Sequence, residues 1–213
     1  MDIDFLKSKI DEHKEESVNL HSILYDSVAN GPGKRIVVWF QGCPFACAGC
    51  FNPDTWNYKQ NSVKTTYELI EIINEYDGDG VTFSGGEPFI HSNSLLKILK
   101  NIKDFSKGVI SFTGFEQEEY LQIPIIQECI KMIDVCIVGR YEDTQKQNKN
   151  IAGSSNQQFI FTSERNINGE IISLDDMKVD QSVEFYFGED MIEITGFPKI
   201  DKKLMKRLGL KLK

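Results

Sequence analysis

The sequence has none of the long apolar segments that mark membrane or secreted proteins. No apolar run in its 213 residues approaches the ~20 residues that a membrane-spanning helix needs. The opening stretch, MDIDFLKSKIDEHKEE, is highly charged and lacks the apolar core of a secretory signal. We therefore expect a cytoplasmic protein with no membrane partner. Thiols stay reduced in that compartment, so clustered cysteines there bind metal more often than they form disulfides.

The chain is also poor in histidine and, over most of its length, in positive charge. His13, His21 and His91 show no spacing typical of metal ligands. The net charge is −8, yet the segment from Lys199 to the end carries +6, which leaves −14 on the first 198 residues. Phosphate contacts dominate nucleic-acid affinity, so this acidic body argues against a nucleic-acid partner.

Strand and helix patterns alternate through the middle of the chain. Apolar, β-branched segments predict strands at 35–40, 81–88, 109–114, 132–139 and 157–163. Helical spacing predicts helices at 65–76, 92–104 and 116–131, the last interrupted near Pro124. This alternation indicates a parallel sheet with helical crossovers and active-site loops at the carboxyl ends of its strands. Five or six such units are too few to close an eight-stranded barrel, so we expect an α/β fold that forms an open, partial barrel.

We divide the chain into three parts. Residues 1–33 form a short charged helix and a lead-in that ends at the turn signal NGPG, and residues 34–165 form the core. Residues 166–213 change to alternating apolar and polar side chains, which predict a β-hairpin around Gly188. Ile200, Leu204 and Leu208 then share one helical stripe, which predicts a terminal helix packed on the core. This extension either docks a partner or completes the sheet.

Three of the five cysteines lie within eight residues, directly after the first predicted core strand. Cys43, Cys47 and Cys50 belong to the stretch QGCPFACAGCFNPDTW, with no fourth ligand nearby. Cys129 and Cys136 lie far off among apolar residues, so we expect them to be buried packing residues. A structural zinc site and a cubane iron–sulfur cluster each normally take four protein ligands. Three thiolates would leave one iron of a cubane open, and the amino and carboxylate groups of S-adenosylmethionine can chelate such an iron.

The C-x3-C-x2-C spacing, followed by SGGEP at 84–88 after the next strand, resembles the radical S-adenosylmethionine superfamily. The stretch NGPGKRIVVWFQGCPFACAGCFNPDTW, with FTGF at 112–115 and GSSNQ at 153–157, is similar to the activating enzymes of glycyl-radical proteins, and most of all to the activators of anaerobic (class III) ribonucleotide reductase. The resemblance covers roughly residues 25–160 and carries the usual false-positive risk of motifs. It implies a partial (β/α)6 radical-SAM-type barrel that holds a 4Fe-4S cluster and S-adenosylmethionine.

The resemblance also implies which residues hold these groups. The cluster ligands are Cys43, Cys47 and Cys50, and the cosubstrate contacts come from Gly49, Cys50, Phe51, Ser84, Gly85, Gly86 and Glu87. Many superfamily members cover the adenine with an aromatic residue just before the third cysteine; Gly49 stands there, so Phe51 is our candidate substitute. Val138 occupies a slot where the family tends to carry Asp, which leaves specificity open. We expect no catalytic side chain beyond the cluster and cosubstrate.

These implications lead to one expected function and two alternatives. The expected function is an activase that reductively cleaves S-adenosylmethionine to a 5′-deoxyadenosyl radical and installs a glycyl radical on a partner, anaerobic ribonucleotide reductase. No second cluster motif is visible, so a flavodoxin or ferredoxin is the expected electron donor. The first alternative is a radical enzyme acting on a small molecule, like 7-carboxy-7-deazaguanine synthase, although that family lacks GPGKR and NPDTW. The second is an iron–sulfur electron carrier or a metal-stabilised module.

Overall fold

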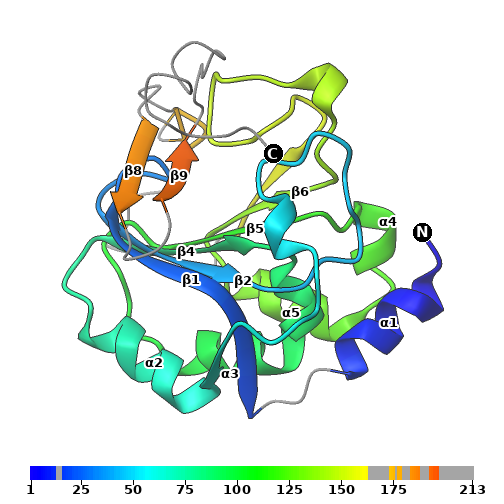
Figure 1. Ribbon diagram of the computed structural model, residues 1–213, viewed down its shortest axis with the longest axis horizontal. Coiled ribbons are helices and arrows are strands. Elements are labelled where there is room, and N and C mark those ends of the chain that lie inside the picture. Colours follow the sequence, from blue (N-terminus) through cyan, green and yellow to red (C-terminus); the bar gives the residue numbers. More distant parts are fainter. Residues whose placement is uncertain (13–15, 163–172, 176, 179–182, 188–191, 197–213) are drawn as a thin grey trace.

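An open seven-stranded sheet lies between a layer of helices and a separate hairpin in the computed structural model (Figure 1). The structure describes residues 1–12, 16–162, 173–175, 177–178, 183–187 and 192–196. Helices α2, α3 and α5 pack below the sheet in Figure 1, and the β8–β9 hairpin lies above it. The predicted α/β class and the open sheet are therefore confirmed. None of the described helices is long and apolar enough to cross a bilayer.

The strands in chain order are β1 (Ser17–Ser27), β2 (Arg35–Phe40), β3 (Ser62–Thr65), β4 (Gly80–Gly85), β5 (Val109–Thr113), β6 (Val135–Val138) and β7 (Gln158–Phe161). Their spatial order is β3-β1-β2-β4-β5-β6-β7. Strands β2, β4, β5 and β6 pair in parallel, as the alternation predicts. Strands β1, β3 and β7 add antiparallel pairs at the two sides.

The helices are α1 (Ile3–Asp11), α2 (Thr66–Glu75), α3 (Ser92–Asn101), α4 (Gln117–Tyr120) and α5 (Pro124–Lys131), with 3-10 turns η1 (Pro53–Thr55), η2 (Pro88–His91) and η3 (Asp143–Gln145). Helix α2 begins with a capping box, in which Thr65 accepts from the Glu68 main chain and Glu68 accepts from the Thr65 main chain. The predicted helix at 116–131 is divided because Pro124 begins a new helix and cannot continue the previous one.

The segment that we expected only as a lead-in, residues 17–33, contains the eleven-residue strand β1. Val18 and Leu20 alternate with polar residues, as a strand with one buried face requires. The register then shifts between Leu20 and Ser22, where β1 pairs with β2. Such a bulge breaks the period of two, so the apolar pattern no longer reads as a strand.

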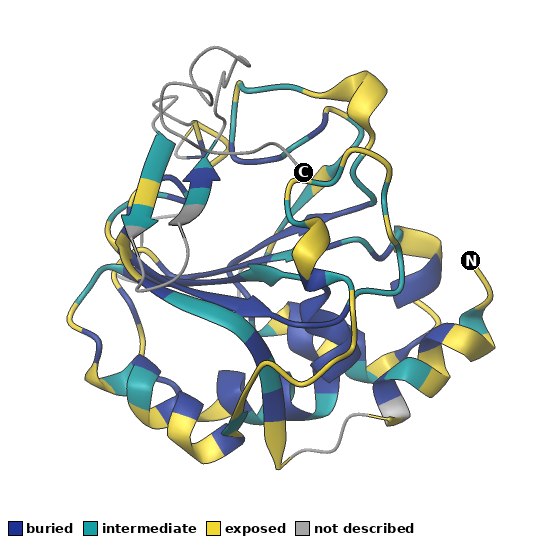
Figure 2. Ribbon diagram, viewed as in Figure 1, coloured by how far each residue is buried: buried dark blue, intermediate teal, exposed yellow. Residues whose placement is uncertain are grey.

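Two apolar layers hold the sheet in place, and its strands are mostly dark blue in Figure 2. The larger layer fills the space between sheet and helices and includes Val38, Phe83 and Leu95, all 0% exposed. It also buries Cys129 and Cys136, which confirms their predicted packing role. The opposite face carries smaller clusters, which centre on other residues of β2, β5 and β6. The helix-free face is therefore only partly covered, and it is where space for ligands remains.

Arg35, the first residue of β2, closes the sheet at the amino ends of its parallel strands. Its side chain is 0% exposed and donates five hydrogen bonds. The acceptors are Thr82 Oγ1 and the main-chain oxygens of Pro32, Val81, Lys107 and Gly108, at 2.7–3.0 Å. Burial lowers the pKa of Arg35 to about 9, against the attraction of Asp134. The arginine therefore stays charged at neutral pH and joins two loops to strand β4.

The hairpin predicted around Gly188 is present. Strand β8 (Val183–Phe187) pairs antiparallel with β9 (Ile192–Gly196). Its turn and the predicted terminal helix lie outside the described residues, so the helix stays a prediction. The three-part division of the chain is likewise not tested.

Candidate metal centre

The three clustered cysteines lie in the loop that follows β2, at the carboxyl edge of the sheet. The loop closes on η1, because Gly42 N donates to Thr55 O at 2.8 Å and Cys43 N donates to Trp56 O at 3.1 Å. All three thiols are free and partly exposed. They line one cavity of about 120 Å³ together with Ser84, Gly85, Gly86 and Glu87. The two motifs quoted from the sequence therefore meet in space; we call this space the cluster cavity.

Gln41, just before the first cysteine, holds the base of the loop. Its side chain is 2% exposed, and its amide nitrogen donates to the main-chain oxygens of Asp54 (3.1 Å) and Asn57 (2.8 Å). His91 contacts the Gln41 main-chain oxygen at 3.2 Å through Nε2. The NPDTW segment that follows the cysteines thus supports the loop through main-chain acceptors, and this is its structural role.

Phe45, between the first two cysteines, is enclosed on three sides. Its ring meets Phe115 edge-on at 5.2 Å between centroids, and the Arg140 guanidinium lies 4.5 Å from its centre. An added Cβ at Gly114 would come within 2.5 Å of the Phe45 ring, so only glycine fits there. The FTGF motif therefore supports the cysteine loop, and we call residues 112–115 the FTGF seat.

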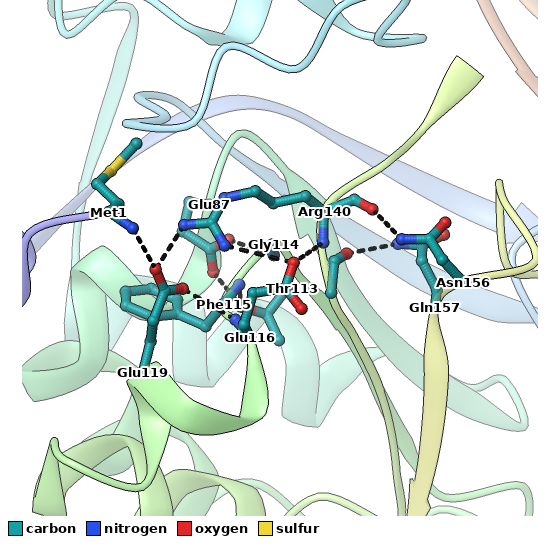
Figure 3. Close-up of polar contacts among 11 residues, drawn as sticks. Met1, Glu87, Thr113, Gly114, Phe115, Glu116, Glu119, Arg140, Asn156 and Gln157 are labelled. Carbon is teal, nitrogen blue, oxygen red and sulfur yellow. Dashed lines mark hydrogen bonds and ion pairs between the residues drawn. The ribbon is translucent and has the colours of Figure 1, made fainter. Parts of the chain in front are cut away.

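Arg140 is held over this seat by carboxylates (Figure 3). Its guanidinium is 2.7 Å from Glu119 Oε1 and 3.3 Å from Glu116 Oε1. The Arg140 main-chain nitrogen also donates to Glu116 Oε1 at 3.1 Å, and Met1 N lies 3.2 Å from Glu119 Oε1. The side chain places a positive charge beside the cysteine loop, and its hydrogen bonds fix where that charge lies.

The two glycines at the end of β4 allow the second motif to lie directly against the cysteine loop. A Cβ at Gly85 would meet Phe40 N at 2.5 Å, and a Cβ at Gly86 would meet Gly42 O at 2.3 Å. Both obstacles are main-chain atoms, which cannot move aside as a side chain can. Gly86 N donates to Phe40 O and Glu87 N to Gly42 O, each at 2.8 Å. Glycine is required here by close approach.

Glu87 is almost completely buried, and protein donors occupy its carboxylate. Oε1 accepts from Phe89 N (3.0 Å) and Thr113 Oγ1 (2.8 Å), while Oε2 accepts from Gly114 N (2.7 Å). Burial raises the pKa of Glu87 to about 7, and these hydrogen bonds oppose the rise. The carboxylate thus ties β4 to the FTGF seat while it lines the cluster cavity.

The donor set suits an iron–sulfur cluster. Burial raises the pKa of the Cys43 thiol to about 12; it also raises that of Cys47, where a main-chain hydrogen bond from Tyr141 acts the other way. A bound cation would lower the pKa of these thiols again, because it stabilises the thiolate. Within the described ranges, no three Cys, His, Asp or Glu side chains converge closely enough to hold a single metal ion. Cluster ligands need not converge in that way, since each thiolate binds its own iron.

A second cavity, of about 160 Å³, continues from the first across the helix-free face of the sheet. The two share Ser84, Phe112, Tyr141 and Gln157. Phe51 lines this second cavity and packs on Tyr141 with ring centroids 5.0 Å apart. Its opposite wall is Ile194–Gly196 of β9, so we call it the hairpin cavity.

The structure thus brings most of the predicted site residues together, with Gly49 as the exception. Gly49 lies beside Asp143 rather than in either cavity lining: φ is +75°, and a Cβ there would come within 2.8 Å of the Asp143 carboxyl carbon. Val138 is 3% exposed in the core layer between sheet and helices, and it lines neither of the two cavities.

Sequence reasoning missed Tyr141 and Gln157, which line both cavities. Gln157 ends the GSSNQ motif; its amide accepts from Gly153 N at 2.9 Å and donates to Gly139 O at 2.9 Å. The motif was the available signal, and its role is to tie this loop to the end of β6.

Comparison with known proteins connects these motifs to a family. A family model described as a 4Fe-4S single cluster domain matches residues 29–160. The pyruvate formate-lyase-activating enzyme of Clostridium pasteurianum is 35% identical over 153 residues, 62% of this chain and 63% of that protein. The anaerobic ribonucleoside-triphosphate reductase-activating protein of Enterobacteria phage T4 is 32% identical over 135 residues, 60% of this chain and 84% of that protein. A solved structure, QueE from Escherichia coli, matches with a TM-score of 0.37 at 20% identity over 46% of this chain and 52% of that one, which is too low to bear on function.

Proposed function

Because this chain belongs to the family of 4Fe-4S single cluster domains, we propose that it is a radical S-adenosylmethionine activase that installs a glycyl radical on a partner enzyme. The single observation that carries this proposal is the cluster cavity, which three cysteines and the Gly85-Gly86 turn line together. The resemblance to glycyl-radical activating enzymes is confirmed by two relatives that bear such names. The expected cofactors, a 4Fe-4S cluster and S-adenosylmethionine, are confirmed with it.

The cofactors supply the difficult chemistry, and the protein binds and orients them. When bound, the cluster supplies the electron that cleaves S-adenosylmethionine to methionine and a 5′-deoxyadenosyl radical. Cys43, Cys47 and Cys50 would hold three irons. Gly85 and Gly86 would let the main chain approach the methionine end closely.

Two predicted contacts take a more definite form in this proposal. Glu87 already accepts three protein hydrogen bonds, so we assign to its carboxylate the positioning of the FTGF seat as well as the expected contact with the cosubstrate. Phe51 and Tyr141 form an aromatic pair at the junction of the two cavities, where an adenine ring would stack on them. Gly49 would act by making room for Asp143.

We assign anaerobic ribonucleotide reductase as the partner and a reduced flavodoxin or ferredoxin as the electron donor. The phage relative, whose length this chain covers to 84%, supports the first assignment by its name. The chain spans 63% of the Clostridium relative, and that relative's name points to a different partner. The partner is therefore what an experiment must decide first.

The test is anaerobic reconstitution followed by two measurements. The reduced cluster should give an EPR signal that S-adenosylmethionine perturbs, and mixing with anaerobic ribonucleoside-triphosphate reductase should yield a glycyl-radical EPR signal. Pyruvate formate-lyase and 6-carboxytetrahydropterin serve as competing substrates. A signal indifferent to S-adenosylmethionine would eliminate the radical enzyme, and turnover of the pterin without any protein would favour the small-molecule alternative.

A further inference from the structure

The hairpin cavity is walled by a segment that the family match does not include. The matched region ends at residue 160, whereas Ile194, Thr195 and Gly196 of β9 form one side of this cavity. The other sides come from the core: Trp39 of β2, Ser84 of β4 and Phe112 of β5. The space next to the cluster cavity therefore owes its shape to an element beyond the family core.

The hairpin is attached to the core by specific polar contacts. The Glu184 carboxylate accepts from Ser27 Oγ at 2.6 Å and from Val28 N at 2.7 Å. On the next strand, Thr195 Oγ1 accepts from Asn30 Nδ2 at 3.0 Å. Tyr186 packs against the apolar cluster of Leu24, Val37 and Trp39 on the sheet. These contacts hold β9 at a set distance from the sheet, as the wall of a binding site requires.

Two features of this wall point to an extended polypeptide as its ligand. Within the described residues, β9 pairs only with β8, so its other edge offers main-chain donors and acceptors to a further strand. Trp39, 5% exposed, lines the side of the cavity that lies across from β9. A cavity of about 160 Å³ admits part of an extended chain but no folded domain.

We propose that the β8–β9 hairpin is the partner-recognition wall of the site, along which an extended, glycine-bearing segment of the partner polypeptide binds in the hairpin cavity. This inference rests on the proposed function, because the glycine must reach the junction with the cluster cavity. It adds to that function a location for the partner and a segment of this chain that selects it. The hairpin would act by holding the peptide, without taking part in cosubstrate cleavage.

The test separates partner binding from cosubstrate cleavage. Glu184 lies outside both cavity linings, so Glu184→Ala loosens the hairpin without touching the cosubstrate. Glu184→Gln, which keeps the shape, gives a milder form of the same change. Glu71→Ala, an exposed substitution on α2, is the matched control. Each reconstituted variant is assayed for 5′-deoxyadenosine formation under dithionite without a partner, and for glycyl-radical yield against the concentration of whichever reductase or lyase the unmodified protein activates.

We expect Glu184→Ala to raise the half-saturating partner concentration roughly tenfold, the effect of losing about one net hydrogen-bonded contact, with partner-free cleavage unchanged. Hydrogen exchange of amides 192–196 should slow when the partner is added to the unmodified protein. If Glu184→Ala lowers cosubstrate cleavage as much as it weakens activation of the partner, the hairpin serves the cosubstrate. If it changes neither quantity, and the partner does not slow exchange of amides 192–196, the hairpin is only a packing element. Both results overturn the inference. Failure of the unmodified protein to form a glycyl radical on any partner defeats the proposed function as well, which distinguishes the two failures.

Discussion

The two ends of strand β2 carry glycine-rich motifs and opposite properties. At the amino end, Arg35 is buried and donates five hydrogen bonds, so no polar group of that side chain remains for a ligand. At the carboxyl end, six residues further along, the cysteine loop opens into a cavity lined by three unpaired thiols. One strand can therefore separate stability from chemistry, with its closed end stabilising the sheet and its open end forming the proposed ligand site.

The cysteines provide the sharpest form of this comparison. Cys47→Ala should reduce cosubstrate cleavage to background without changing the fold, because Cys47 is partly exposed in the loop and is one of the three proposed cluster ligands. Cys136→Ala should keep cleavage and lose about 1–2 kcal/mol of unfolding free energy, since it leaves a small cavity in the core. Deoxyadenosine formation and urea unfolding measure the two effects. Loss of cleavage in both variants to the same degree would contradict the assignment.

The closed end should respond in the opposite way. Arg35→Leu removes five hydrogen bonds and leaves buried carbonyls without donors, so we expect a loss of about 3–5 kcal/mol of stability. Arg35→Lys should restore little, because an ammonium group cannot reproduce the fork of the guanidinium. The exposed neighbour Lys34, replaced by Ala, is the control and should change stability by less than about 0.5 kcal/mol. If Arg35→Leu unfolds at nearly the same temperature as the unmodified protein, the closed end does not stabilise the sheet.

A smaller effect, a pH-dependent change in the free energy of unfolding, should come from Glu119 near the open end. Burial alone would raise the pKa of Glu119, but its hydrogen bonds, first that from Arg140, outweigh burial and lower the pKa below its ordinary value of 4.5. A carboxylate with a lowered folded-state pKa stabilises the fold above the unfolded-state pKa and loses that contribution as the pH falls through the folded-state pKa. Because Arg140 is partly exposed, we expect about 0.5–1 kcal/mol.

The measurement for this prediction is the difference in unfolding free energy between the unmodified protein and Glu119→Gln. The difference should be present at pH 7 and shrink below pH 4.5, as the carboxylate becomes protonated. Glu71→Gln, exposed on α2, provides a matched control. A difference that stays constant down to low pH would mean that the Glu119–Arg140 pair does not hold the seat of the cysteine loop.

Local sequence patterns predicted the parts of the molecule that local forces control. RIVVWF reads as a strand buried on both faces, and all six residues of β2 are buried. Thr65 and Thr66 both read as N-cap candidates, and Thr65 is the one that caps α2. Strand β1 was not predicted, because its bulge breaks the alternation that identifies strands. Arg35 was recognised only as part of the GPGKR resemblance, because nothing local distinguishes a buried arginine from a surface one.

The sequence by itself determined the chemical groups of the site: three cysteines in one loop after a buried strand, and a glycine pair at the end of the next strand. Only the tertiary structure decided what surrounds them, such as Tyr141 beside Phe51 and β9 opposite Trp39. The physical reason is distance along the chain. Ligand spacing and glycine turns act over a few residues and can be read directly, whereas Gly49 beside Asp143 and Asn30 bonded to Thr195 meet only after the sheet has formed.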